Sequence, residues 1–264
     1  MRRTTCAASV RNDSRRLSAV LAAAIAILIL AMAQTSRGQS FNFNTGNDTG
    51  FTHYSPLGAF GAGGTFSFPG GGYRIQAPSS PSPGAAGPGR AGSFVMGTNY
   101  TTFSASVDLV DWDNSLDQAF GLLARTSSIG LGTTNGYAFT YATDGPSIDI
   151  SRVTGEQAKN LGSMAVTLDP AKDYRLVFQG VGDSLTGAVY DLTDLTTPLA
   201  VATATDATYT AGVNGVFVFD NSPTKDQPAD ATFDNFSATS TVPEPTALTL
   251  LLLISLLPYR RRQR

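Results

Sequence analysis

Apolar residues alternate with polar or small residues along most of the chain between residues 34 and 242, and this spacing of two restricts the fold more than any other feature. Residues 103–109 read FSASVDL, and residues 174–179 read YRLVFQ. Successive side chains of a β-strand point to opposite faces of its sheet, so such segments predict strands with one face on a core and one in water. Apolar residues almost never recur at a spacing of three or four, so no convincing helix is expected in this region.

Several segments of this kind, separated by turn residues, predict an all-β protein. Pairs that favour turns, such as Asn135-Gly136 and Asp169-Pro170, lie between them. Many short strands without helices are typical of a β-sandwich of two antiparallel sheets. The predicted strands are residues 65–68, 73–76, 103–109, 120–125, 137–141, 148–151, 174–179, 185–192, 215–219 and 231–238.

Two segments interrupt the alternation. Residues 78–92 consist almost wholly of Pro, Ser, Gly and Ala, which cannot pack a core, so we expect a long mobile loop there. Residues 221–229 are expected to form a polar loop before the last strand. The sandwich domain is therefore expected over residues 34–238, followed by a linker and a C-terminal tail over residues 239–264.

The first 33 residues have the layout of a signal peptide. Residues 1–16 carry five arginines, and residues 17–32 form an apolar segment without a charged side chain. The small residues at the end of this segment predict that signal peptidase cuts between Ala33 and Gln34. A pair of adjacent arginines before the apolar segment leaves twin-arginine export open beside the general secretory route.

The last 23 residues, VPEPTALTLLLLISLLPYRRRQR, combine a stiff spacer, an apolar run and a basic end. These parts are Pro243, Glu244 and Pro245; residues 246–257; and Arg260, Arg261 and Arg262. About a dozen apolar residues are fewer than the roughly 20 that a transmembrane helix needs, although residues 242–259 could cross a thin membrane. Cationic ends stay in the cytoplasm, so the rest of the chain is expected outside. The alternative is a tail that packs on its own domain.

This layout resembles the sorting tail of the PEP-CTERM proteins of Gram-negative bacteria, in which the tripeptide precedes a membrane segment and an arginine cluster. The resemblance implies recognition by an exosortase-type transpeptidase that cuts near Pro243-Glu244-Pro245. It also implies delivery to the cell surface, the outer membrane or the extracellular matrix, after a transient stay of the C-terminal helix in the inner membrane. The resemblance covers less than a tenth of the chain and concerns destination more than activity.

The charge of the sandwich region restricts its partners. Residues 34–242 contain 9 basic and 18 acidic side chains, which gives a net charge of −9. Nucleic acids and anionic lipids need a basic surface, so we expect neither as a partner. The only cysteine, Cys6, lies in the signal peptide, so the mature protein is expected to lack disulfides and thiol chemistry.

The order of several motifs resembles the concanavalin A-like jelly rolls, including their laminin-G-like and carbohydrate-binding members. The motifs are FGLLAR (120–125), GYAFTY (136–141), IDISRV (148–153), YRLVFQG (174–180), NGVFVF (214–219) and ATFDNFSA (231–238). The resemblance implies a two-sheet jelly roll over most of residues 41–238. It is weak for activity, because that family includes sugar-binding modules, β-glucanases and structural domains.

Catalytic residues are not expected. A glucanase needs two carboxylates flanking the scissile bond, and Glu156, in a turn, is the only glutamate of the sandwich region. Asp108, Asp111 and Asp113 could serve in principle, but a solvated strand end explains them more simply. His53 is the only histidine, which excludes a multi-histidine metal centre and disfavours a Ser-His-Asp triad.

Sugar binding requires less, namely exposed aromatic rings beside polar side chains. Trp112, the only tryptophan, lies among aspartates and an asparagine, and it is our first candidate for a glycan contact. Tyr137 and Tyr141 are the next candidates. The alternative for Trp112 is a structural role as a half-buried residue at a sheet edge.

A structural calcium ion near Asp234 is a further expectation. By resemblance, Asp234 on the last strand would bind Ca²⁺ with backbone carbonyls from the start of the domain, for which residues 44–48 are a candidate source. An aspartate on a solvated strand also needs no metal, so the cofactor remains open.

The sequence therefore favours a secreted, non-catalytic surface or matrix protein that associates with extracellular polysaccharide. Two alternatives remain, a purely structural matrix protein without a ligand and a polysaccharide hydrolase. Neither the ligand nor the oligomeric state follows from the sequence.

Overall fold

The computed structural model describes residues 38–222 and 226–240. The predicted signal cleavage site, Ala33 and Gln34, and the predicted sorting tail lie outside the described residues. Within the described ranges, no helix is long and apolar enough to cross a membrane. The described residues therefore bear on the β-sandwich domain and not on export or sorting.

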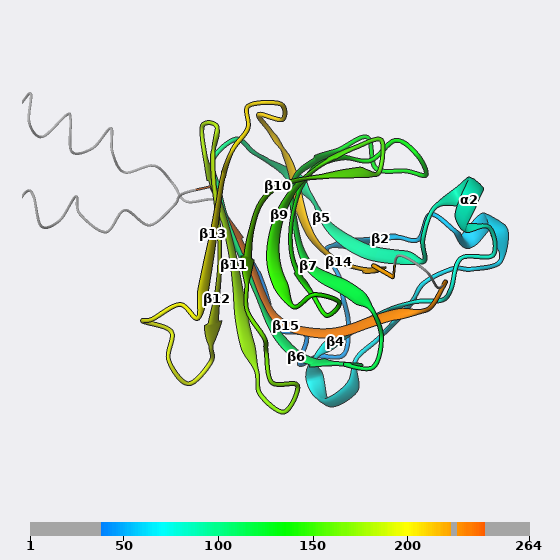
Figure 1. Cartoon of the computed structure of the whole chain (residues 1–264), viewed down its shortest axis with the longest axis horizontal. Coiled ribbons are helices and arrows are strands. Elements are labelled where there is room, and N and C mark those ends of the chain that lie inside the picture. Colours follow the sequence, from blue (N-terminus) through cyan, green and yellow to red (C-terminus); the bar gives the residue numbers. More distant parts are fainter. Residues whose placement is uncertain (1–37, 223–225, 241–264) are drawn as a thin grey trace, which may run out of the picture. The chain divides into compact units, whose positions relative to one another are not determined.

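Two antiparallel sheets make up the domain (Figure 1). Sheet A has eight strands, β13-β12-β11-β6-β15-β4-β3 with β1 paired to β15, and sheet B has seven, β10-β9-β8-β7-β14-β5-β2. The strands of sheet A are β13 (Ala200–Thr205), β12 (Ser184–Asp191), β11 (Tyr174–Val181), β6 (Phe103–Trp112), β15 (Ala229–Thr239), β4 (Tyr73–Ala77), β3 (Thr65–Ser67) and β1 (Gly38–Phe41). The strands of sheet B are β10 (Gln157–Ala165), β9 (Ser147–Thr154), β8 (Asn135–Ala142), β7 (Gln118–Ser127), β14 (Gly212–Asp220), β5 (Arg90–Tyr100) and β2 (Phe51–Tyr54). The predicted all-β sandwich is confirmed.

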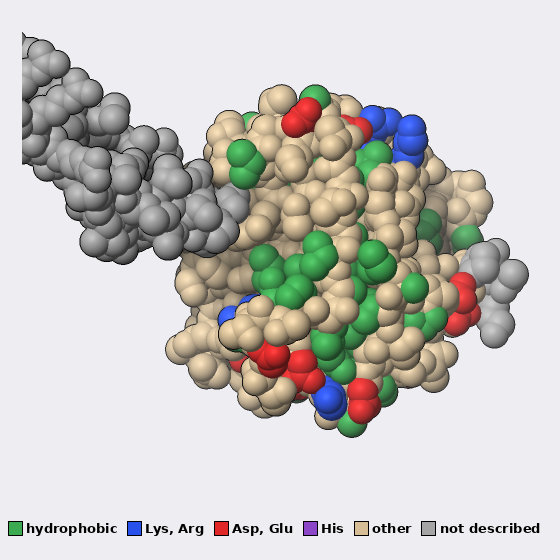
Figure 2. Space-filling model, turned by 60° about the vertical axis from the view of Figure 1, so that its left-hand side comes forward, with side chains coloured by type: hydrophobic (Ala, Val, Ile, Leu, Met, Phe, Trp, Pro, Cys, Tyr) green, Lys and Arg blue, Asp and Glu red, His purple; other side chains and the backbone are tan. Residues whose placement is uncertain are grey.

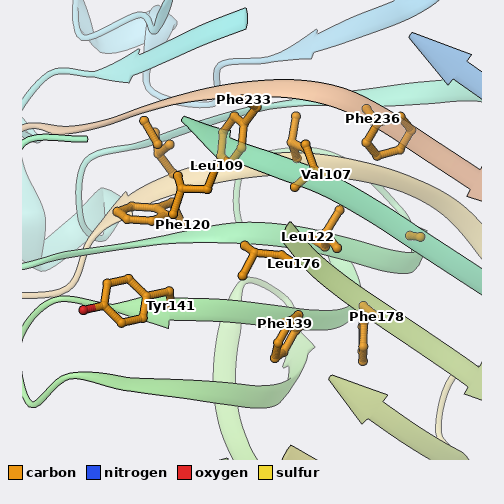
Figure 3. Packing of buried hydrophobic residues seen from close by; sticks show 14 of the residues in the cluster. Val107, Leu109, Phe120, Leu122, Phe139, Tyr141, Leu176, Phe178, Phe233 and Phe236 are labelled. Carbon is orange, nitrogen blue, oxygen red and sulfur yellow. The ribbon is translucent and has the colours of Figure 1, made fainter. Parts of the chain in front are cut away.

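The core lies between the two sheets and is filled by the apolar positions of the alternating segments. Figure 3 shows Val107 and Leu109 of β6 together with Leu176 of β11, on the side of sheet A, near Leu122 of β7 and Phe139 of β8 from sheet B. All five side chains are fully buried. Burial of this apolar surface is the main force that holds the sheets together.

Each predicted strand overlaps an observed strand, but the sequence analysis predicts no strand at the positions of five observed ones. They are β1, β2, β5, β10 and β13. β10 illustrates one reason why a strand escapes this kind of prediction. Seven of its nine residues are exposed, and its sequence QAKNLGSMA shows no alternation of apolar and polar residues. A strand at a sheet edge can be held by backbone hydrogen bonds alone, and such bonds leave no hydrophobic pattern in the sequence.

The segment predicted as a mobile loop over residues 78–92 is partly wrong. Residues 90–92 belong to β5, and Pro83–Ala86 form one short helical turn, α2. Ala86 is buried against Leu57 and Ala62 in a small apolar cluster. A sequence of Pro, Gly, Ser and Ala can therefore pack where an alanine meets apolar side chains from another segment.

The outer face of sheet B is less polar than alternation predicts. Tyr54, Phe94, Leu123 and Ala138 form a second buried cluster, against which Ile129 packs. Ile129 belongs to the loop between β7 and β8, which thus lies over this face. The prediction of one wet face therefore fails for this part of sheet B.

A buried ion pair holds this loop in place. Arg90 at the start of β5 donates two hydrogen bonds to Glu156 in the β9–β10 turn, at 3.0 and 2.7 Å. Glu156 also accepts a hydrogen bond from the backbone N–H of Gly132, and Thr134 donates to the Tyr54 hydroxyl at 3.3 Å. Burial raises the pKa of Glu156 and lowers that of Arg90. The two charges are therefore held where water stabilises them only weakly.

The surface of the domain also carries apolar side chains. Figure 2 shows hydrophobic side chains gathered near the middle of one face, with charged side chains mostly toward its margins. Leu199, just before the edge strand β13, is 50% exposed, and Val201 within that strand is 37% exposed. Apolar atoms make up roughly half or more of the surface of a folded protein, so these exposed side chains do not by themselves indicate a binding site.

Candidate functional site

The first predicted glycan contact, Trp112, is buried in the core with 5% of its surface exposed. Its ring lies 5.8 Å from that of Phe120 and 6.2 Å from those of Tyr141 and Tyr174, measured between centroids. Its indole N–H donates to the Asn114 side chain at 3.2 Å. The prediction that Trp112 stacks on a sugar is therefore wrong, because neither face of the ring is open to a ligand.

The other two predicted contacts, Tyr137 and Tyr141, are also buried, at 0% and 1% exposure. Both belong to β8 and point between the sheets, where the Tyr137 hydroxyl donates to Asp206 at 2.8 Å. The Tyr141 hydroxyl accepts a hydrogen bond from the backbone N–H of Leu168 at 3.2 Å. These tyrosines occupy the apolar positions of a strand, and the large area of each ring favours the core over the surface.

A pocket of about 440 Å³ that combines polar and apolar side chains opens instead at one end of sheet A. Its lining combines charged and polar side chains with two prolines, a leucine and small residues. They are Gly63, Thr65, Arg74, Gln76, Ala77, Pro78, Asp113, Leu116, Pro228, Ala229 and Asp230. The volume lies within the range of about 300–1,000 Å³ that is usual for small-molecule sites.

Asp230 organises this pocket. Its side chain is 10% exposed and pairs with Arg74, whose Nε donates at 3.1 Å. The other oxygen of the carboxylate accepts the backbone N–H of Asp113 at 3.2 Å. Strand pairing explains the arrangement, because Asp230 of β15 lies opposite Gln76 of β4, and Arg74 lies two residues earlier on the same face.

Arg74 and Asp113 are the more exposed of the charged residues that line the pocket. The Arg74 side chain is 37% exposed, and Asp113 is exposed after the end of β6. The hydroxyl and the backbone N–H of Ser115 bind Asp113 Oδ1 at 2.6 and 2.9 Å. The Ser115 hydroxyl and N–H, with a contribution from Arg74, lower the pKa of Asp113. Asp113 is therefore a fixed carboxylate with a second oxygen available to a ligand.

The chemistry of this pocket suits a ligand rich in hydroxyl groups. Guanidinium and amide groups donate hydrogen bonds, and carboxylate, hydroxyl and amide oxygens accept them. Leu116, Pro78 and Pro228 add apolar surface beside these groups. A few polar groups that converge next to an apolar wall are typical of small-molecule sites.

The sequence missed this pocket, although part of the signal is present. Arg74 and Gln76 alternate with buried Tyr73 and Ile75, so both could be predicted to point outward from one strand. Their partner Asp230 follows more than 150 residues later. Only the pairing of β4 with β15 brings these side chains together.

The predicted metal residue, Asp234, lies on β15 opposite Asp108 of β6. Asp108 is 2% exposed and binds the Arg175 guanidinium at 2.6 and 2.9 Å, so the prediction of a solvated aspartate is wrong at this position. Asn235, with a φ of 49°, donates to the same carboxylate at 2.9 Å. Burial, with the negative charge of Asp108, raises the pKa of Asp234.

These residues do not form a calcium cage by themselves. Ca²⁺ takes six to eight oxygen ligands, and the Asp108 oxygens already bind Arg175 and Asn235. Asp48, the carboxylate of the predicted segment 44–48, accepts hydrogen bonds from His53 and Tyr73. Across residues 38–222 and 226–240, no group of three or more His, Cys, Asp or Glu side chains could hold a metal ion. Calcium binding at Asp234 stays a prediction.

Comparison with known proteins places the fold. No protein-family model and no curated protein matches the sequence. The carbohydrate-binding module CBM66 from Bacillus subtilis matches with a TM-score of 0.52 and 19% identity, over 72% of this chain and 96% of that one. The basic winged bean lectin, solved with the Tn-antigen, matches with a TM-score of 0.52 and 11% identity, over 80% of this chain and 100% of the lectin.

An enzyme is also among the similar structures. SCLam, a non-specific endo-β-1,3(4)-glucanase of family GH16, matches with a TM-score of 0.53 and 11% identity, over 77% of this chain and 91% of the enzyme. The chain therefore has the jelly-roll β-sandwich fold of lectins and carbohydrate-binding modules, as the motif order predicted. Because the fold is common to binding proteins and a hydrolase, the function has to be argued from the site.

Proposed function

We propose that the domain binds a polysaccharide without cleaving it and that the pocket around Arg74, Asp113 and Asp230 is its binding site. The observation that carries this proposal is the convergence of these three side chains with Gln76 on one pocket beside an apolar wall. The fold supports it, because structurally similar chains include a carbohydrate-binding module and a lectin.

The pocket lacks the acid that hydrolysis would need. A glycosidase requires one protonated carboxyl group, kept neutral by a raised pKa, and one carboxylate. The pKa of Asp113 is lowered, and the Asp230 carboxylate already accepts hydrogen bonds from the Arg74 guanidinium and from the backbone N–H of Asp113. Glu156 is engaged in its ion pair with Arg90. Hydrolysis therefore remains the less favoured alternative.

Binding can be tested with Asp113→Ala, which removes an exposed carboxylate from the pocket. We expect the affinity of the purified protein for its polysaccharide to fall by about tenfold or more, because a hydrogen bond to a charged group contributes roughly 1.5–3 kcal/mol. Isothermal titration against candidate polysaccharides measures the effect, and reducing-end assays on the same samples detect any cleavage.

Asp194→Ala is the matched control for Asp113→Ala. Asp194 is exposed in the β12–β13 connection and accepts hydrogen bonds from the N–H and hydroxyl of Thr196, at 2.9 and 2.5 Å, as Asp113 does from Ser115. Both variants lose the same type of turn contact, but only Asp113 lines the pocket. Equal affinities for the two variants would place the site elsewhere, and release of reducing ends would favour the hydrolase.

We further propose that the domain is exported and sorted to the cell surface or matrix. Support comes from the sequence alone, namely the signal peptide and the tail built from Pro243-Glu244-Pro245, the apolar run and the arginines. The partners would be a signal peptidase and an exosortase-type transpeptidase. The alternative is a purely structural matrix protein without a ligand. Binding of a polysaccharide would exclude this alternative, and a lack of binding would favour it.

Processing gives a direct test of this export. The mature species is expected to begin near Gln34 and to lack residues 248–264, which intact-mass measurement of the extracellular protein would reveal. Neutral residues in place of Arg260, Arg261 and Arg262 should impair sorting, because the cationic stop on the cytoplasmic side is lost. An extracellular form that still ends in Arg264 contradicts the proposal.

A further inference from the structure

The charges of the candidate pocket restrict what it can bind. Its charged lining residues are one cation, Arg74, and two anions, Asp113 and Asp230, so the pocket has a net charge of −1. The surrounding domain adds to this field, because residues 34–242 carry a net charge of −9. A negative pocket in a negative domain repels an anionic ligand.

Arg74, the only cationic side chain that lines the pocket, is already paired with Asp230. Arg74 donates through Nε and Nη2 to Asp230, and its charge also acts on Asp113. A guanidinium that is paired with one carboxylate and lies near a second cannot neutralise a third without loss of those contacts. The pocket therefore offers hydrogen-bond donors without spare positive charge.

The rest of the lining is neutral. Thr65 and Gln76 carry uncharged polar groups, and Thr65 Oγ1 donates to Gln76 Oε1 at 3.4 Å. Leu116, Pro78 and Pro228 present apolar surface, which suits the C–H face of a sugar ring. Hydroxyl groups can donate to Asp113 and accept from Arg74, whereas a carboxylate or sulfate can only accept.

We infer that the pocket selects neutral, hydroxyl-rich sugar units and excludes acidic ones such as uronic acids and sulfated sugars. This inference rests on the proposed function and adds the chemical class of the ligand. An acidic matrix polysaccharide would then be bound, if at all, through its neutral residues.

An array of matched oligosaccharides tests the selection. The probes are gluco-, galacto- and manno-oligosaccharides beside their uronic acid counterparts, which differ by a carboxylate in place of a hydroxymethyl group. With the full chain in mild detergent at low salt, we expect at least one neutral series to bind, and its acidic counterpart to bind at least about tenfold more weakly. The difference should narrow at high salt, because ions screen the repulsion between exposed charges.

Two variants make the outcome specific to the pocket. Asp113→Asn removes one negative charge, and it should reduce the discrimination between neutral and acidic probes, whereas Asp194→Asn should leave it unchanged. Acidic probes that bind as tightly as neutral ones overturn the inference and leave the proposed function in place. If no probe of either class binds, the proposed function falls and the inference falls with it.

Discussion

Replacing Glu156 by glutamine is expected to lower the free energy of unfolding by about 3 kcal/mol, near the lower end of what the loss of one partner from a buried ion pair costs. The side chains of Arg90 and Glu156 are only 12% and 8% exposed, so the variant leaves the Arg90 charge without a carboxylate in a poorly solvated position. Urea denaturation of wild type and variant, followed by far-ultraviolet circular dichroism, measures the difference.

The double variant Arg90→Met/Glu156→Leu separates the cost of an unpaired buried charge from the cost of losing the ion pair itself. It removes both charges, so we expect it to be more stable than Glu156→Gln alone, although the carbonyls of Ala86 and Pro88 lose their contact with Arg90. Lys172→Met breaks an exposed pair with Asp191 and should barely move the unfolding midpoint. Equal midpoints for wild type and Glu156→Gln would show that the buried pair contributes nothing to stability.

Phe178→Ala is expected to cost roughly 3–5 kcal/mol of stability, the usual range for the removal of a buried ring. Phe178 of β11 is fully buried and lies between Phe103 and Phe139, at centroid distances of 5.0 and 5.7 Å. Its removal leaves a cavity between the sheets that neighbouring strands cannot fill without a shift of backbone. The same urea experiment measures this effect.

Phe60→Ala is the control for this core substitution. Phe60 is 50% exposed, so its truncation removes little buried surface and should change stability by less than about 0.5 kcal/mol. A loss for Phe178→Ala as small as that for Phe60→Ala would mean that the two sheets do not pack as described.

The sequence predicts the centre of this fold well, because the strands that form the core bury one face. β6 shows this, since Phe103, Ala105, Val107 and Leu109 are all fully buried. A segment such as β10 is held by pairing with β9 and has little buried surface, so its sequence lacks the period of two. Periodicity reports burial and does not report hydrogen bonding between strands.

The candidate site could not be predicted in the same way, for two reasons. The polar neighbours of Trp112 in the sequence predict an exposed ring. Their composition does not show, however, which face of the sheet the ring occupies. The pocket depends on the contact of Arg74 with Asp230, which the register of two distant strands creates. Arg125 is a similar case, as a buried arginine whose guanidinium binds the backbone carbonyls of Thr101 and Gly182 at 3.0 and 2.8 Å.

The pairing of the first strand with the last has a consequence for how this domain would be displayed. Gly38 of β1 lies opposite Thr239 of β15, so both ends of the described domain leave it at the same corner. Asp230, in the pocket, lies nine residues earlier on β15, which corresponds to at most about 30 Å along an extended antiparallel strand. A domain tethered at either end would therefore hold its pocket at the far end of β15, away from the tether.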